Sequence, residues 1–169
     1  MLFDYTAPAI GRTDKSFIIE HDQKEIGQME RYFTKQTRNP QYDVNILAKD
    51  FTSDDDYKIN QTEIKLFGGT KWDIYKNGEI IGRAEYPKGF FKAHQVVVRL
   101  DNHPMLTMKV KFDRTASLLN EYEDEIGRMK RTTSFKRTYE GEVDDQYIDM
   151  PLMLFYSLLH TFWCSSHIG

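Results

Sequence analysis

The sequence predicts a mostly β protein, a closed antiparallel β-barrel of about twelve strands around a central hydrophobic C-terminal helix. Apolar and polar residues alternate with a period of two through residues 1–148, in short runs that end at Gly, Asn, Asp or Pro. Aromatic residues make up 14% of the chain, and this content favours strands over a helical bundle. About a dozen strands are too many for one open sheet, so closure into a barrel or a sandwich is the economical way to remove exposed edges.

The chain has the length and composition of one globular domain over residues 1–169. Its 40% hydrophobic and 29% charged residues are typical of a protein that folds on its own. The formal charge of −3 argues against a nucleic-acid partner, which usually needs a strongly basic domain. The single cysteine excludes an intramolecular disulfide, and Met1–Pro8 lacks the basic and apolar regions of a signal peptide. We therefore expect a cytoplasmic protein, with peripheral association at a membrane left open.

One hairpin is marked most clearly among the predicted strands. Lys71–Tyr75 and Ile80–Tyr86 alternate in polarity and flank Asn77-Gly78, a pair that supplies the positive φ angles of a tight turn. The acidic run Asp54-Asp55-Asp56 is interpreted as a solvated loop. The other predicted strands are Leu2–Tyr5, Ser16–Glu20, Ile26–Phe33, Tyr42–Ala48, Glu63–Phe67, Phe90–Leu100, Leu106–Phe112, Ser117–Glu123, Ile126–Thr133 and Phe135–Glu140.

A weak internal repeat recurs along the chain. Glu25-Ile26-Gly27, Ile80-Ile81-Gly82 and Glu125-Ile126-Gly127 each follow a polar turn. Glycine inside a strand often marks a bulge or the close approach of another backbone. The repeat therefore predicts strand geometry, and we assign it no catalytic role.

The character of the chain changes at Asp149. Residues 150–163 are apolar on nearly every side, and Asp149 as N-cap with Pro151 just inside predicts a helix over about 149–165. The segment is at the lower length limit for crossing a bilayer, which normally takes about 20 residues. No Lys or Arg flanks it to anchor a span. We expect a buried core helix and no transmembrane span, with a membrane tail anchor as the alternative.

The layout resembles a known superfamily. The many-stranded region, the Gly78-Glu79-Ile80-Ile81-Gly82 type of hairpin and a final apolar helix opened by Asp149-Met150-Pro151-Leu152 are similar to the tubby C-terminal-like superfamily. The similarity covers nearly the whole chain and is greatest to the short bacterial LURP-one-related, scramblase-like proteins. It implies a twelve-stranded barrel threaded by a hydrophobic helix. Because members range from phosphoinositide-binding tubby domains to proposed scramblases, it implies no single function, and no lipid-contacting residue is carried over.

A basic stripe is the most suggestive local feature. In an extended strand Arg128, Lys130 and Lys136 share one side, and Lys109 and Lys111 belong to a nearby outward face. Such a stripe could meet anionic headgroups, near which each cation contributes on the order of 1 kcal/mol. The ordinary alternative is a solvated barrel exterior, on which Lys and Arg keep sheet edges from pairing.

No sequence motif identifies a catalytic or metal site. The chain contains no G-x-S-x-G, no H-E-x-x-H, no phosphate loop and no dinucleotide fingerprint. His160, Cys164 and His167 fall on one side of the predicted helix and could ligate zinc, but no further donor is evident. The acidic run Asp54-Asp55-Asp56 lacks the spacing and the glycine of an EF-hand. We therefore predict a protein that is not an enzyme and has no metal and no cofactor.

The sequence favours a non-enzymatic binding module with anionic phospholipid or a membrane surface as the ligand of the basic stripe. This hypothesis rests on the stripe and on the superfamily resemblance. A protein-interaction or regulatory scaffold is one alternative. A scramblase-like protein, whose apolar helix leaves the barrel for the bilayer, is the other.

Overall fold

The computed structural model describes residues 1–8, 13–34, 39–64, 69–87, 95–111, 114–132 and 137–166. Within these ranges twelve strands form one antiparallel sheet, followed by a short 3-10 helix and an α-helix. The elements are β1 (Leu2–Ala7), β2 (Phe17–His21), β3 (Lys24–Tyr32), β4 (Asn45–Asp50), β5 (Asp56–Glu63), β6 (Lys71–Lys76), β7 (Glu79–Glu85), β8 (Gln95–Leu100), β9 (Leu106–Val110), β10 (Thr115–Leu119), β11 (Glu125–Arg131), β12 (Arg137–Val143), η2 (Asp145–Tyr147) and α1 (Leu152–Ser165).

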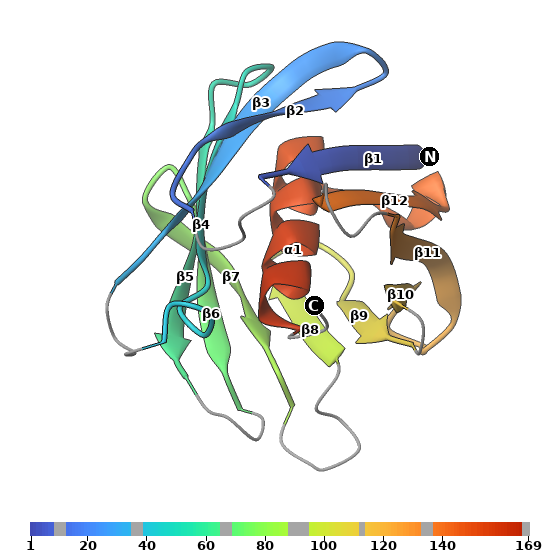
Figure 1. Cartoon of the computed structure of the whole chain (residues 1–169). Coiled ribbons are helices and arrows are strands. Elements are labelled where there is room, and N and C mark those ends of the chain that lie inside the picture. The colour runs from blue at the N-terminus through green and yellow to red at the C-terminus, as the bar shows by residue number, and fades with distance from the viewer. Residues whose placement is uncertain are drawn as a thin grey trace.

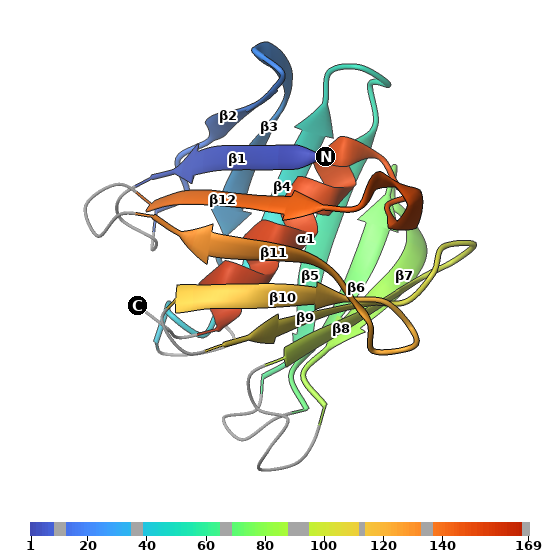
Figure 2. The same ribbon diagram turned by 90° about the vertical axis from the view of Figure 1, so that its right-hand side faces the viewer.

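The sheet curls into a nearly closed barrel around α1, as Figures 1 and 2 show. Hydrogen-bonded neighbours follow the order β1-β12-β11-β10-β9-β8-β7-β6-β5-β4-β3-β2. Strands that follow each other in the chain are therefore neighbours from β2 to β12, and β1 returns to pair with β12. β1 and β2 are the two ends of the sheet and lie side by side, and we call the line between them the seam. The predicted barrel of about twelve strands is confirmed.

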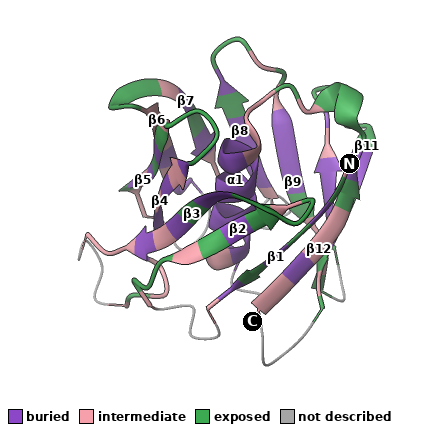
Figure 3. Ribbon diagram, turned by 90° about the horizontal axis from the view of Figure 1, so that it is seen from above, coloured by how far each residue is buried: buried purple, intermediate pink, exposed green. Residues whose placement is uncertain are grey.

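The core of the barrel is α1 itself. Its buried residues include Phe155, Tyr156 and Phe162, each with no exposed surface, and Phe3 from β1 meets Phe155 edge-on at 5.4 Å between ring centroids. Figure 3 shows buried residues over most of α1, whereas buried, intermediate and exposed residues follow one another along the strands. A helix that is apolar on every side needs burial on every side, and the barrel provides it. The predicted core helix is confirmed, and no helix in the described ranges has the length and apolar character that a bilayer crossing requires.

The start of α1 differs from the prediction. Pro151 occupies the N-cap position with φ −56° and ψ 136°, and no side chain caps the helix. Asp149 is exposed and lies two residues before that position, so it is not the N-cap. The extended conformation of Pro151 delays the helix to Leu152.

The fifth strand also differs from the prediction. The sequence placed it at Glu63–Phe67, whereas β5 runs from Asp56 to Glu63, and residues 65–68 lie outside the described ranges. Gln61 is the cause, because its polar side chain faces the interior and breaks the apolar alternation. It is 3% exposed, and its Oε1 accepts a hydrogen bond from the main-chain N of Val44 at 2.9 Å.

The repeated Ile-Gly pairs mark three β-bulges at matching places in the sheet. In the hairpins β2–β3, β6–β7 and β10–β11 the pairing register shifts by one residue at Ile26, Ile81 and Ile126. The glycine that follows each of them faces a main-chain oxygen of the next strand. A Cβ on Gly27 or Gly82 would lie 2.3 or 2.4 Å from that oxygen, so no larger residue fits. The structural interpretation of the repeat is confirmed.

Candidate functional site

Four of the predicted stripe cations come together on the outside of the barrel. Arg128 and Lys130 lie on β11, Lys109 lies on β9 and Lys111 directly follows it, and all four side chains are exposed. Strand alternation explains this placement, because Met129, between the two β11 cations, points inward and is buried. β10 lies between β9 and β11, so the four positions share one face of three adjacent strands.

Glu125 neutralises two of these cations. Its carboxylate accepts hydrogen bonds from Lys111 Nζ and Ser117 Oγ, both at 2.6 Å, and from Arg128 Nε. These donors, Lys111 first, lower the pKa of Glu125 from its ordinary 4.5 to about 2. The carboxylate is therefore charged at neutral pH and offsets part of the positive charge on this face.

A second carboxylate pairs with Lys130. Its Nζ lies 2.8 Å from Oε1 of Glu140, the residue directly opposite on β12. Lys109 has no hydrogen bond or ion pair with any described residue, and Lys136 lies outside the described ranges. The stripe predicted from the sequence is thus a mixed-charge surface wherever the structure describes it.

A groove of about 960 Å³ crosses this surface. It covers the outer side of β1, β12, β11 and β10, which lie side by side in Figure 2, and the turn between β2 and β3 borders it. We call it the outer groove. Leu2, which is 76% exposed, adds an apolar side chain. The charged side chains that line the groove within the described ranges are the cations Lys111, Arg128 and Lys130 and the carboxylates Asp4, Asp22, Glu140 and Glu142.

Two of the three residues considered as zinc ligands, His160 and Cys164, lie inside the barrel. Cys164 Sγ is 3.4 Å from His160 Nε2, and the Tyr5 hydroxyl is 3.5 Å from Nδ1 of the same ring. Burial, assisted by neighbouring arginine charges, lowers the pKa of His160 to about 3. His167 lies outside the described ranges, and inside them no three His, Cys, Asp or Glu side chains are grouped to hold a metal ion.

The acidic run is held by lysines. Lys49 Nζ lies 2.6 Å from Asp54 Oδ1 and 3.5 Å from Asp56 Oδ1, and Lys76 Nζ lies 2.9 Å from Asp55 Oδ2. A hydrogen bond from Lys76 is the largest cause that lowers the pKa of Asp55 to about 2. Asp54 and Asp55 precede β5 and Asp56 opens it, so the predicted loop ends one residue earlier than expected. Lysines of the protein itself therefore neutralise these carboxylates.

Sequence reasoning found the cations but missed their acid partners. Glu140 reaches Lys130 only because β11 and β12 pair in one register, and a single sequence does not give that register. The alternation on β12 could have predicted one of these partners, because an inward Tyr139 requires its neighbour Glu140 to face outward, and Tyr139 is buried. The same pattern predicts an outward Glu142, which is exposed.

Comparison with known proteins gives no match to a family model, to a curated protein or to a solved structure. The resemblance to the tubby C-terminal-like superfamily therefore stays a prediction from the sequence. The outer groove and its charges are accordingly the basis for assigning a function.

Proposed function

We propose that the protein is a non-enzymatic binding module and that the outer groove receives a segment of a partner protein. The mixed charge of the groove is the observation that carries this proposal. Three cations and four carboxylates of the described residues line it, so an anionic surface would meet attraction and repulsion of similar size there. A protein segment can present both signs of charge in register with the groove, and such complementarity gives specificity and orientation.

The size of the groove supports the same proposal. Its volume of about 960 Å³ lies at the upper end of the range for ligand sites, roughly 300–1,000 Å³. Leu2 supplies an exposed apolar side chain at its border, and such side chains provide contact area that charge pairs lack.

Anionic phospholipid, the ligand expected from the sequence, is the second candidate. Lys111, Arg128 and Lys130 are 50%, 71% and 56% exposed in their ion pairs, and pairs this exposed contribute little free energy. These cations could exchange a carboxylate partner for a lipid phosphate. Lys109, exposed and without a partner among the described residues, favours the same ligand.

Two charge reversals in one ion pair separate the candidates. The probe for the first is a peptide selected on the wild-type protein from a phage-displayed library, and its affinity is measured by fluorescence anisotropy. Because a partner segment uses both signs, Lys130→Glu and Glu140→Lys should each weaken binding by about tenfold, equal to roughly 1.4 kcal/mol. Arg99→Gln on β8, away from the groove, is the matched control and should bind as wild type does.

Vesicle co-sedimentation provides the other half of the test. Vesicles of phosphatidylcholine alone and with phosphatidylglycerol are compared at low salt, where electrostatic binding is strongest. An anionic membrane predicts opposite effects of the two reversals, with Lys130→Glu weaker and Glu140→Lys stronger. If the vesicles show these opposite effects and no peptide binds, anionic phospholipid replaces the partner segment as the ligand. If the selected peptides bind both variants as tightly as they bind the wild type, the partner-segment proposal is wrong.

A further inference from the structure

Three arginines point into the barrel at one end, and they are separate from the outer groove. Arg31, Arg131 and Arg137 each lie two residues from a buried side chain of their own strand, so strand alternation turns them inward. They converge near Tyr139. Burial raises the pKa of that phenol, and the charges of all three arginines oppose the rise. The three strands β3, β11 and β12 thus bring their positive charges to one place.

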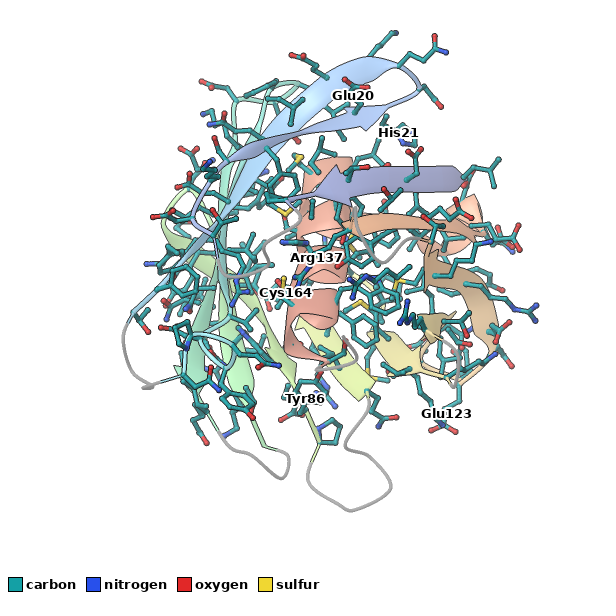
Figure 4. The ribbon with its side chains drawn as sticks, viewed as in Figure 1. Glu20, His21, Tyr86, Glu123, Arg137 and Cys164 are labelled. Carbon is teal, nitrogen blue, oxygen red and sulfur yellow. The ribbon has the colours of Figure 1, made fainter. Side chains whose placement is uncertain are left out.

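This place is the end of α1. The charges of Arg31 and Arg137 act on His160 and Cys164, two residues in the C-terminal half of the helix. Figure 4 shows Arg137 and Cys164 next to each other along the helix. Trp163 lies at the same level, stacked on Tyr139 with 5.3 Å between ring centroids.

The arginines differ from the outer cations in how they are compensated. Arg31 is 5% exposed, and its Nη2 donates to the main-chain oxygens of Asp43 at 2.8 Å and Pro40 at 3.3 Å. Arg131 and Arg137 make no hydrogen bond or ion pair with a described residue, although the Nε of each is shielded from solvent. A guanidinium N–H that loses water without gaining a partner is destabilising, so an anion here would satisfy the two shielded Nε donors that the described residues leave without an acceptor.

A crevice reaches this cluster from the surface. Among the described residues, Lys15, Arg31, Arg137 and His160 supply its titratable lining, and no described carboxylate lines it. The crevice opens at the seam, since Ala7 ends β1 and Phe17 begins β2. Its volume of about 10 Å³ accepts one water-sized group, so a larger anion must sit at the opening or move a side chain.

We propose that Arg31, Arg131 and Arg137, together with Lys15, form an anion site at the seam that takes a phosphate monoester group. Guanidinium groups match phosphate oxygens with paired N–H donors. A phosphate monoester carries between about 1.5 and 2 negative charges near neutral pH, and that charge suits a cluster of several cations better than a monoanion does.

A purely structural role makes a different prediction. Cations near the C-terminal end of a helix stabilise its dipole, and α1 has no basic residue in its own last turn. If Arg131 and Arg137 serve only that purpose, replacing either of them lowers the stability by the same amount in phosphate as in chloride of equal ionic strength.

The test is thermal unfolding in sodium phosphate and in sodium chloride of equal ionic strength at pH 7.5. At phosphate ten times above its Kd the melting temperature of the wild type should rise by about 3–6 °C relative to chloride. Arg131→Gln and Arg137→Gln should each lose this rise, while Lys109→Gln, which removes an exposed cation of the outer face, should keep it. The absence of a phosphate-specific rise in the wild type, or its survival in both arginine variants, would overturn the proposal.

A second measurement needs no variant and so does not depend on whether the substitutions fold. Cys164 is the only cysteine of the chain and lies beside the cluster, so its rate of alkylation reports on this end of the barrel. Inorganic phosphate should slow alkylation several-fold at constant ionic strength, and an unchanged rate would contradict an anion bound there.

The source of the phosphate is identified by three probes. Inorganic phosphate, glycerol 3-phosphate and vesicles containing phosphatidic acid carry the same group. Binding of the vesicles that is lost in Arg137→Gln assigns a lipid headgroup, and binding of the two soluble probes alone assigns a free phosphate compound. If none of the three binds, the proposal is wrong. The Lys130 and Glu140 reversals leave this site intact, so its failure and that of the outer groove are distinguishable.

Discussion

His160→Gln removes an imidazole that the folded protein keeps uncharged. The ring is 3% exposed, and burial, with the charges of Arg31 and Arg137, lowers its pKa from 6.5 to about 3. Between these two values the unfolded chain binds a proton that the folded chain does not bind. The stability that His160 contributes is therefore complete above pH 6.5 and is lost progressively as the pH falls toward 3.

The size of the effect follows from the two pKa values. At pH 5 the folded ring is still neutral, whereas an unfolded ring with a pKa of 6.5 is almost fully protonated. Linkage gives a loss of about 2 kcal/mol in the free energy of unfolding between pH 7.5 and pH 5. For a chain of this length, that corresponds to a decrease of about 4–8 °C in melting temperature. Most carboxylates titrate below this window, so they contribute little to it.

The assay is urea unfolding at pH 7.5 and pH 5.0, followed by tryptophan fluorescence. His160→Gln should be less stable than wild type at pH 7.5, because it disturbs packing, but it should lose about 2 kcal/mol less on acidification. Tyr5→Phe is the matched control: it removes the hydroxyl 3.5 Å from Nδ1 and leaves the imidazole in place, so the pH dependence should persist. An equal loss on acidification in wild type and His160→Gln would refute the reasoning.

Three further substitutions test the packing of the barrel. Phe155→Ala empties a fully buried site and should lower the free energy of unfolding by about 3–5 kcal/mol, measured by urea titration; a loss under about 1 kcal/mol would show that the barrel does not close around α1. Gly27→Ala would place a Cβ 2.3 Å from a main-chain oxygen of β4 and should cost about 1–3 kcal/mol, and an unchanged urea midpoint would contradict the close approach. Tyr86→Phe removes a hydroxyl 3.2 Å from Ser165 Oγ and should cost about 0.5–1.5 kcal/mol, with a wild-type melting temperature as the opposing result.

Much of the fold could be predicted because its strongest signals are local. Asn77 and Gly78 adopt φ angles of 51° and 88°, as the tight hairpin turn requires. The helix around Phe155 is apolar on every side and must be buried, and the many predicted strands were the only other elements that could surround it. Where the prediction failed, tertiary contacts had overridden the local pattern. Gln61 occupies an inward position through a hydrogen bond to Val44, and no local rule anticipates that partner.

The candidate site was less predictable, because it depends on which strands become neighbours. The outward direction of Arg128 and Lys130 follows from alternation and is confirmed. Their carboxylates come from the start of β11 and from β12, so charge balance on this face depends on the register. The inward Arg131 and Arg137 lie at the ends of β11 and β12, where a charged residue in an inward position contradicts the expectation of an apolar core.

The position of α1 in the chain determines when the barrel can be completed. All of the described strands precede the helix, so the ribosome finishes the sheet before it makes the segment that fills it. During that interval Phe3 and Tyr139, which contact Phe155 and Trp163 of α1 in the finished protein, have no helix to pack against. Neighbouring strands can pair as they emerge, but the curled sheet would stay hollow and expose its apolar side. The barrel can therefore be filled only after α1 is synthesised, and the unfilled sheet is the form most exposed to aggregation and most dependent on chaperones.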